Sequence, residues 1–149
     1  MLTIGKLASL THVSNDTLRY YEHEGLLEPA GKSRAGYRLY NDVSAKRIHF
    51  IKQAQQCGFT LSQIRELLLL RSRDAACCGD VRKRAIAKKL QIEDKIKAMK
   101  AMSKALDQLI ADCTNEKKPV RECSIMEALE RANMADRVRR IGGKPEKRN

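Results

Sequence analysis

Apolar positions in the first 70 residues recur at the three- and four-residue spacing of amphipathic helices, and polar capping residues and glycines interrupt them. The pattern predicts one helix that begins after Thr3 and a second that begins after Ser14, because threonine and serine are favourable N-caps. The second helix should stop at Gly25, since glycine commonly ends helices. Two short helices joined by a tight turn predict a helix-turn-helix motif, whose second helix enters the major groove of DNA. The apolar face of the first helix is expected to comprise Ile4, Leu7, Ala8 and Leu10.

The segment that follows changes from helical spacing to alternation. Tyr37 and Leu39 alternate with Arg38 and Tyr40, and Ala35-Gly36 supplies turn residues, so a small β-hairpin is predicted. A hairpin beside a helix-turn-helix is a wing, and its arginine and tyrosine side chains could reach phosphates or the minor groove.

Helical spacing then returns twice. A third helix is predicted from Asp42 to about Gln56, with Asn41 or Asp42 as its cap and Gly58 as its stop. A fourth helix begins after Thr60, with Gln63 at the capping-box position. The apolar face of the third helix should contain Val43, Ile48, Ile51 and Ala54.

A longer helical pattern runs from Val81 to about Ala111, and its stripe positions step by four, three, four, three and four. This spacing is typical of a heptad-like stripe. A stripe this narrow buries too little surface alone, so we expect it to pair with a partner chain; packing within its own chain is the alternative. Met99 and Met102 are expected to be core residues rather than soft-metal ligands. The stripe comprises Ile92, Ile96, Met99, Ser103, Leu106 and Ile110.

Composition narrows the class of protein. The 149 residues include no Trp, four Tyr and two Phe, so a large independent core is not expected and pairing would bury more apolar surface. The net charge of +12 favours a polyanionic partner such as nucleic acid, although a soluble surface with a basic tail would give the same balance. No apolar run approaches the roughly 18–20 residues that span a membrane, and the N-terminus lacks a signal-peptide pattern. We therefore expect a cytoplasmic protein whose thiols stay reduced.

The five cysteines are an odd number, which argues against a disulfide framework and favours metal binding, redox sensing or simple burial. Cys113 and Cys123 bracket a short polar loop. Two thiolates placed in this way can hold a soft metal ion but leave its coordination open. A short helix is predicted after Cys123, and its N-terminal amides would offset the thiolate charge. Cys57, before Gly58, is expected to be a small buried residue.

Five segments together resemble, in their order and spacing, the MerR family of transcriptional regulators. They are Ile4-Gly-Lys-Leu-Ala, Thr17-Leu-Arg-Tyr-Tyr-Glu, Gly25-Leu-Leu, Gly36-Tyr-Arg-Leu-Tyr and Gly58-Phe-Thr-Leu-Ser-Gln-Ile. The resemblance extends through about Glu130 and implies a mainly α fold. It implies a winged helix-turn-helix DNA-binding domain with a small β-hairpin wing at 1–71, and a linker and long antiparallel coiled-coil dimerisation helix at 72–112. A metal-binding loop and short helix follow at 113–133, and a basic, disordered tail is expected at 134–149.

The resemblance also implies the partners. We expect a homodimer that binds double-stranded promoter DNA and has RNA polymerase as a further partner. We expect no enzymatic activity and no binding to a membrane. One of Tyr20 and Tyr21 is expected in the core, because adjacent helix positions face different ways. His12, His23 and His49 share no spacing and are expected at the surface or in turns. For any one cation among the implied DNA contacts the alternative is a solvated surface position, and for Tyr20 it is a place in the core. The implied contacts are Thr17, Arg19, Tyr20, Lys32, Tyr37, Arg38 and Lys52.

The implied antiparallel pairing would bring Cys78 of one subunit beside Cys113 and Cys123 of the other. A cysteine at position 78 resembles the branch of the family that answers divalent ions, since the copper(I) branch carries serine there. Zn(II) is the first expectation, with Cd(II) or Pb(II) close behind. Cys77 is either a bystander or an auxiliary ligand.

One departure concerns a second zinc ion. Thr114 and Pro119 stand where the zinc-sensing branch has a further cysteine and a histidine, which puts a two-zinc site in doubt. Oxygen ligands would then come from Asp112, Glu116 or Glu122.

The resemblance implies an activator of a metal efflux or resistance gene. Metal binding would shift the two DNA-reading domains, and the dimer would bend and untwist an overlong promoter spacer so that polymerase engages both of its elements. The alternatives are a Cu(I)- or Hg(II)-responsive regulator and a thiol redox-sensing regulator of the same family. A multidrug-binding regulator would need a large C-terminal ligand domain, and only 26 residues (149 − 123) follow Cys123.

Overall fold

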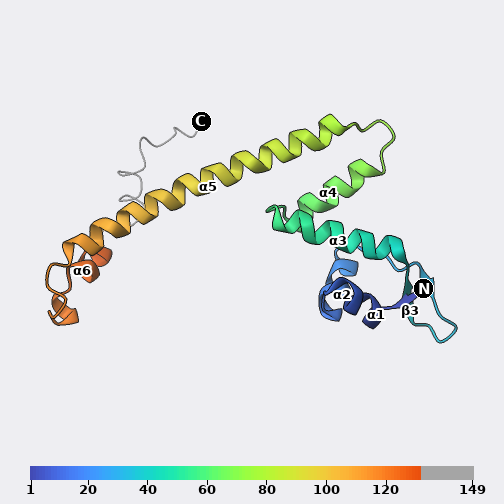
Figure 1. Cartoon of the computed structure of the whole chain (residues 1–149), viewed down its shortest axis with the longest axis horizontal. Coiled ribbons are helices and arrows are strands. Elements are labelled where there is room, and N and C mark those ends of the chain that lie inside the picture. The colour runs from blue at the N-terminus through green and yellow to red at the C-terminus, as the bar shows by residue number, and fades with distance from the viewer. Residues whose placement is uncertain (132–149) are drawn as a thin grey trace. The chain divides into compact units, whose positions relative to one another are not determined.

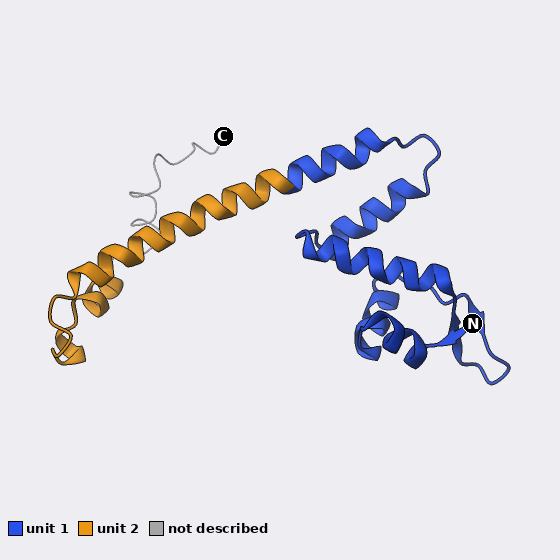
Figure 2. Cartoon of the chain, viewed as in Figure 1, with its two compact units in different colours: residues 1–88 blue, residues 89–149 orange. Residues whose placement is uncertain are grey.

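A computed structural model describes residues 1–131 of the chain (Figure 1). The basic tail expected at 134–149 and the last two residues of the segment expected at 113–133 lie outside the described residues. The chain divides into two compact units, residues 1–88 and 89–149 (Figure 2). In chain order the elements are β1 (Leu2–Thr3), α1 (Ile4–Thr11), α2 (Asn15–His23), β2 (Gly31–Lys32), β3 (Arg38–Tyr40), α3 (Asp42–Gln56), α4 (Leu61–Arg71), α5 (Cys78–Asp112), the 3₁₀ helix η1 (Val120–Glu122) and α6 (Ser124–Arg131).

The helix-turn-helix predicted from the sequence is present as α1 and α2. The Thr3 hydroxyl accepts a hydrogen bond from the Lys6 amide (3.4 Å), and the Ser14 hydroxyl accepts one from the Thr17 amide (3.1 Å). Gly25 follows α2 with a φ of +69°, a left-handed conformation that glycine adopts without strain. The capping residues therefore fix the start of both helices where the sequence indicated.

A three-stranded antiparallel sheet forms the wing, with strand order β1-β3-β2. Gly31 pairs with Leu39, and Leu2 pairs with Tyr40. The hairpin turn lies where it was predicted, since Gly36 has a φ of +84° and its amide donates to the Ser33 carbonyl (2.9 Å). The pairing of β1 with the wing was not predicted. It ties the start of the chain to the hairpin and so joins the wing to α1.

Helices α3 and α4 begin with capping boxes. Asn41 and Ser44 exchange hydrogen bonds at the start of α3, and Thr60 and Gln63 do so at the start of α4. The core of this unit joins α1, α2, α3, α4 and the wing, and comprises Leu7, Leu18, Tyr21, Leu26, Leu27, Tyr40, Ile48, Ile51, Ala54 and Ile64.

Three side chains expected on buried faces are exposed instead: Leu10, Val43 and Cys57. Leu10 lies in the last turn of α1, Val43 in the first turn of α3, and Cys57 is the C-cap of α3. The helix periodicity placed them correctly on a face, but the neighbouring elements do not cover the ends of these helices.

Helix α5 begins at Cys78, three residues before the predicted Val81. The Asp80 carboxylate accepts a hydrogen bond from the Cys77 amide (2.8 Å) and so caps the earlier start. The first turns of α5 belong to the N-terminal unit, where Arg84 forms an ion pair with Glu66 of α4. The Lys88 ammonium lies 5.7 Å from the centre of the Phe59 ring in the same unit.

The part of α5 in the C-terminal unit has two apolar faces. The apolar members of the predicted stripe are exposed: Ile92, Ile96, Met99, Leu106 and Ile110. A second row, missed in the sequence, consists of buried Ala101, Ala105 and Leu109 at four-residue intervals. The two faces are distinct, and the stripe is an exposed apolar row that a partner could cover. Met102, which was expected in the core, is exposed in the single chain as well, and so is Leu90. Within residues 1–131, no helix has both the length and the apolarity needed to cross a membrane.

Candidate metal centre and nucleic-acid interface

The loop between α5 and α6 carries two cysteines at its ends. The Ser124 hydroxyl donates to the Asp112 carbonyl (3.2 Å), which links the first residue of α6 to the last residue of α5. Cys113 and Cys123 are the residues immediately inside this hydrogen bond, and both are half-buried. Local hydrogen bonds hold their backbones as well, because the Cys113 amide donates to Ile110 (3.1 Å) and the Cys123 amide to Val120 (3.0 Å). The hydrogen bond between Ser124 and Asp112 therefore closes the loop at the two residues that flank Cys113 and Cys123.

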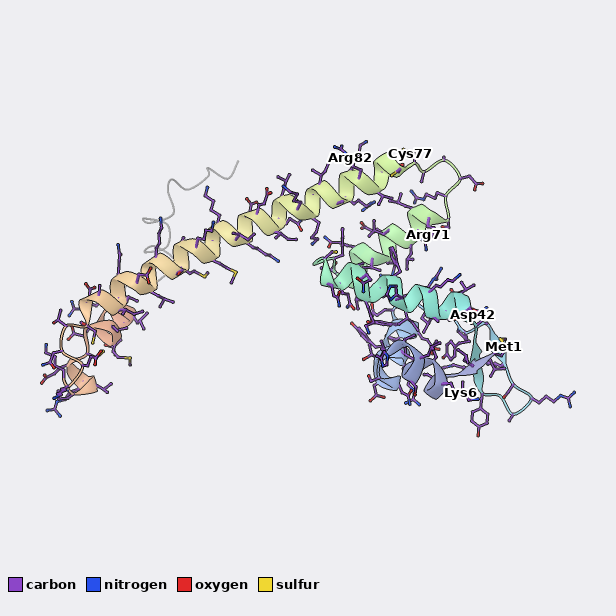
Figure 3. All side chains as sticks on the ribbon, viewed as in Figure 1. Met1, Lys6, Asp42, Arg71, Cys77 and Arg82 are labelled. Atoms are coloured by element: carbon purple, nitrogen blue, oxygen red, sulfur yellow. The ribbon has the colours of Figure 1, made fainter. Side chains whose placement is uncertain are left out.

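The other end of α5 carries the second group of thiols. Cys77 lies directly before the helix (Figure 3). Cys78 is the first residue of the helix. Both side chains are exposed. Hydrogen bonds from the Cys77 amide and thiol to the Asp80 carboxylate hold the pKa of that carboxyl below its ordinary value. Asp80 therefore stays ionised and fixes the backbone next to Cys78.

Cys77, Cys78 and Cys57 also line one cleft of the N-terminal unit, with a volume of about 520 Å³. Its walls are largely apolar and come from α3, α4 and the start of α5; they include Phe50, Phe59, Leu67, Leu68 and Val81. The exposure of Cys57 is explained by this position, since the residue borders the cleft instead of the core.

The donor set of the loop suits a thiophilic ion but is incomplete. Thiolate sulfur is a ligand for zinc, copper(I) and heavier soft ions, and structural zinc sites take four ligands. Within residues 1–131 of a single chain, no three His, Cys, Asp or Glu side chains lie together as a metal-binding group. Cys113 and Cys123 alone would leave an ion that takes four ligands two ligands short.

Side chains of α2 form the first part of the expected DNA surface. Arg19 is exposed and lies 3.7 Å from Asp16, a loose pairing that leaves its guanidinium accessible. Tyr20 is 51% exposed, whereas Tyr21 is 4% exposed and belongs to the core, so the expectation that one tyrosine is buried is confirmed. Thr17 is half-buried, and its hydroxyl lies 2.8 Å from that of Ser14.

The wing supplies the second part. Lys32 on β2 and Tyr37 in the turn are exposed, and Arg38 on β3 is exposed next to Glu22 of α2. Arg19, Tyr37 and Arg38 border a common groove between α2 and the wing. This grouping of cations and an aromatic ring provides donors for phosphates.

Lys52 has a different environment. Its ammonium donates to the Thr11 carbonyl (3.1 Å) at the end of α1, and its side chain is half-buried. Such a contact satisfies a free carbonyl at a helix C-terminus, where a cation is also favoured by the helix dipole. A stabilising role for Lys52 is thus visible, and its contact with DNA remains a prediction.

Two acidic residues near this surface were not recognised in the sequence. The Glu22 carboxylate accepts hydrogen bonds from both Arg38 (2.7 Å) and Tyr40. The Glu24 carbonyl, at the end of α2, accepts bonds from Arg65 of α4, one of them 3.1 Å long. Glu22 lies inside the segment Thr17-Leu-Arg-Tyr-Tyr-Glu, but nothing in that segment shows that its partners are 16 and 18 residues away.

Comparison with known proteins gives the family. Residues 2–70 match the family described as MerR HTH family regulatory protein, and residues 45–109 match the one described as MerR, DNA binding. The mercuric resistance operon regulatory protein of Bacillus cereus is 40% identical over 126 residues, which cover 85% of this chain and 95% of that protein. The HTH-type transcriptional regulator ZntR of Escherichia coli K12 is 36% identical over 131 residues, which cover 87% of this chain and 93% of that protein.

A solved structure agrees with these relatives. The crystal structure of the transcription regulator PbrR691 from Ralstonia metallidurans CH34 in complex with lead(II) is similar with a TM-score of 0.78 and 36% sequence identity. The similarity covers 87% of this chain and 99% of that one. These relatives are regulators and not enzymes. On this evidence the chain belongs to the MerR family of helix-turn-helix transcriptional regulators.

Proposed function

We propose that the chain is a homodimeric, metal-responsive regulator that binds promoter DNA in the cytoplasm. On binding Zn(II), or alternatively Cd(II) or Pb(II), it activates a gene for metal efflux or resistance. The observation that carries this proposal is the closed loop after α5. The hydrogen bond from the Ser124 hydroxyl to the Asp112 carbonyl closes this loop, with half-buried Cys113 and Cys123 at its two ends, and this supports their assignment as a pair of soft ligands.

The third thiolate in this proposal is Cys78 of the other subunit. Cys78 begins a continuous helix of 35 residues and Cys113 follows its last residue. At about 1.5 Å per residue such a helix is roughly 50 Å long, whereas a zinc–sulfur bond is about 2.3 Å. An antiparallel partner helix, as the family resemblance implies, would present its own Cys78 at this loop.

The exposed stripe supports the pairing that this site requires. Its apolar side chains repeat at heptad-like spacing and are left uncovered by the rest of the described chain. Two such stripes packed together would bury surface that a chain with few aromatic residues cannot bury alone. Each dimer would then hold two equivalent sites, one at each end.

Metal binding in such a dimer would act on DNA through differential affinity. An ion that links the loop of one subunit to the first residue of α5 in the other favours the arrangement in which these groups meet. Because the first turns of α5 belong to the DNA-reading unit, that arrangement sets the position of α2 and the wing. A bent or untwisted spacer would let RNA polymerase engage both promoter elements, at a deformation cost of a few kcal/mol.

The identity of the metal is supported only by the donor set and the relatives. Three thiolates suit Zn(II), Cd(II) and Pb(II), and the similar structure of PbrR691 contains lead(II). A Hg(II)-responsive regulator is the second candidate, favoured by the 40% identity with the mercuric resistance regulator. The same proposal includes Cys77 as an auxiliary ligand. It also includes the DNA contacts of Thr17, Arg19, Tyr20, Lys32, Tyr37, Arg38 and Lys52.

In vitro transcription under anaerobic conditions tests the proposal. The reduced protein is titrated with Zn(II), Cd(II), Pb(II), Hg(II) and Cu(I) on its own promoter region. We expect the strongest activation with Zn(II), Cd(II) or Pb(II), and loss of that activation in Cys78→Ser with DNA binding retained. A reduced protein that binds none of these ions tightly but responds to peroxide would instead be a redox regulator.

A further inference from the structure

Glu22 is an acidic residue in the middle of the surface that the proposed function assigns to DNA. It is the last residue of the segment Thr17-Leu-Arg-Tyr-Tyr-Glu and lies three positions after Arg19 on α2. A carboxylate beside a DNA phosphate is repelled, so a solvated glutamate here would weaken binding. Glu22 is not solvated, because its side chain is only 11% exposed.

Both carboxylate oxygens of Glu22 have partners on the same strand of the wing. Oε2 accepts from the Arg38 guanidinium at 2.7 Å, and Oε1 accepts from the Tyr40 hydroxyl. Arg38 and Tyr40 are two positions apart on β3, so their side chains leave the strand on the same side. One carboxylate therefore fastens the wing strand to the helix expected in the major groove.

The environment makes this contact persistent. Tyr40 is completely buried, and burial together with the nearby Glu22 carboxylate raises the pKa of its hydroxyl to about 12. The hydroxyl therefore remains a donor across the neutral range. Arg38 is held at one of its nitrogens, while its side chain remains 54% exposed. An arginine has five N–H donors, so the bond to Glu22 leaves others for a phosphate.

We propose that Glu22 is a positioning residue for DNA binding: it holds the Arg38 guanidinium in the orientation that contacts a phosphate, and so strengthens DNA binding although it carries a negative charge. The carboxylate restricts a long, rotamer-rich side chain before DNA arrives, which lowers the ordering cost of the contact. This inference rests on the proposed placement of Arg38 at DNA.

Glu22→Gln separates positioning from simple charge. The amide oxygen can still accept the Tyr40 hydrogen bond, so the buried hydroxyl keeps a partner, but the ion pair with Arg38 is removed. Simple electrostatics predicts tighter DNA binding, because a negative charge is removed. Positioning predicts the opposite sign. We expect DNA affinity to fall about three- to tenfold. The slope of log affinity against log salt concentration should become shallower by up to about 0.9 for each phosphate that the variant no longer neutralises.

The assay is fluorescence anisotropy with a labelled random-sequence DNA duplex, since a phosphate contact carries no sequence information. Glu28→Gln is the matched control, because Glu28 is an exposed glutamate after α2 and its removal changes only the charge. Circular dichroism and thermal unfolding establish that each variant is folded. Glu22→Gln is also measured in an Arg38→Ala background, where it should no longer weaken binding.

The outcomes are distinguishable. If Arg38→Ala leaves DNA affinity unchanged, the placement of Arg38 at DNA fails and the inference about Glu22 fails with it. If Arg38→Ala weakens binding but folded Glu22→Gln binds as tightly as the wild type or tighter, only the positioning role is overturned. An equal decrease from Glu22→Gln in both backgrounds would also overturn it, because the effect would not pass through Arg38.

Discussion

Leu106→Ala should weaken the dimer without unfolding the chain. Leu106 lies in the exposed stripe of α5 and is 51% exposed in the single chain, so about half of its surface is left for a partner to bury. Full burial of a leucine is worth about 1.5–3 kcal/mol, so the remaining half contributes roughly 0.8–1.5 kcal/mol in each subunit. A symmetric dimer contains the change twice, which weakens association by about 1.5–3 kcal/mol and raises the dimer Kd roughly 10- to 150-fold.

Sedimentation equilibrium over a dilution series of the reduced, metal-free protein measures this Kd directly. Lys104→Ala is the matched control, because Lys104 lies two residues away and about 160° around the helix from Leu106. The control removes a comparable length of side chain from a different face of the same turn and should leave the Kd within twofold. An unchanged Kd in Leu106→Ala, or an equal change in both variants, would refute the assignment of the stripe to the dimer interface.

Three further predictions concern the N-terminal unit. Thr60→Ala removes the capping box of α4 and should lower the free energy of unfolding by about 1 kcal/mol, measured by urea denaturation. The pKa of the Tyr40 hydroxyl is raised from 10.0 to about 12 in the folded state. The stability that this shift contributes is complete below pH 10 and is lost as the pH rises toward 12. Tyr40→Phe should therefore flatten the plot of unfolding free energy against pH between pH 10 and pH 12. Glu66→Gln breaks the partly exposed ion pair with Arg84, which is worth about 0.2–1 kcal/mol. If this pair couples α5 to the DNA-reading unit, metal-dependent activation should fall by up to about fivefold while metal affinity stays unchanged. An unaltered activation ratio would show that this pair does not couple α5 to the DNA-reading unit.

Local signals in the sequence were sufficient for most of the fold. Ser14, Asn41 and Thr60 cap the helices that they were expected to cap, and Gly36 lies in the predicted turn with positive φ. These features depend on the residue itself and its nearest neighbours along the chain. They could therefore be derived without knowledge of tertiary contacts.

Features that depend on distant parts of the chain could not be derived in this way. Strand β1 contains two residues and exists only because it pairs with β3. The exposure of Leu10 and the burial of Ala101 are decided by which element covers each helix face, and periodicity does not contain that information. The ion pair between Glu22 and Arg38 likewise joins a helix and a strand that only the folded unit brings together.

In the candidate metal centre, too, some features follow from the local sequence and others depend on distant parts of the structure. The positions of Cys113 and Cys123 at the ends of a loop could be read from the sequence, and the structure adds the hydrogen bond that closes this loop. The third ligand was inferred only from family resemblance, because spacing does not give the direction of helix pairing. A direct experiment on this ligand therefore tests the shared site best.

Mixed dimers provide that experiment. Cys78→Ser chains and Cys113→Ser/Cys123→Ser chains are prepared separately, then unfolded and refolded together, and Cd(II) binding is followed by thiolate-to-metal charge-transfer absorption. If each site takes Cys78 from one subunit and the loop cysteines from the other, the mixed dimer regains one three-thiolate site, while neither parent dimer has any. If the mixed dimer shows no three-thiolate site although wild-type dimers bind two ions, the metal is held within a single subunit and the proposed shared site is wrong.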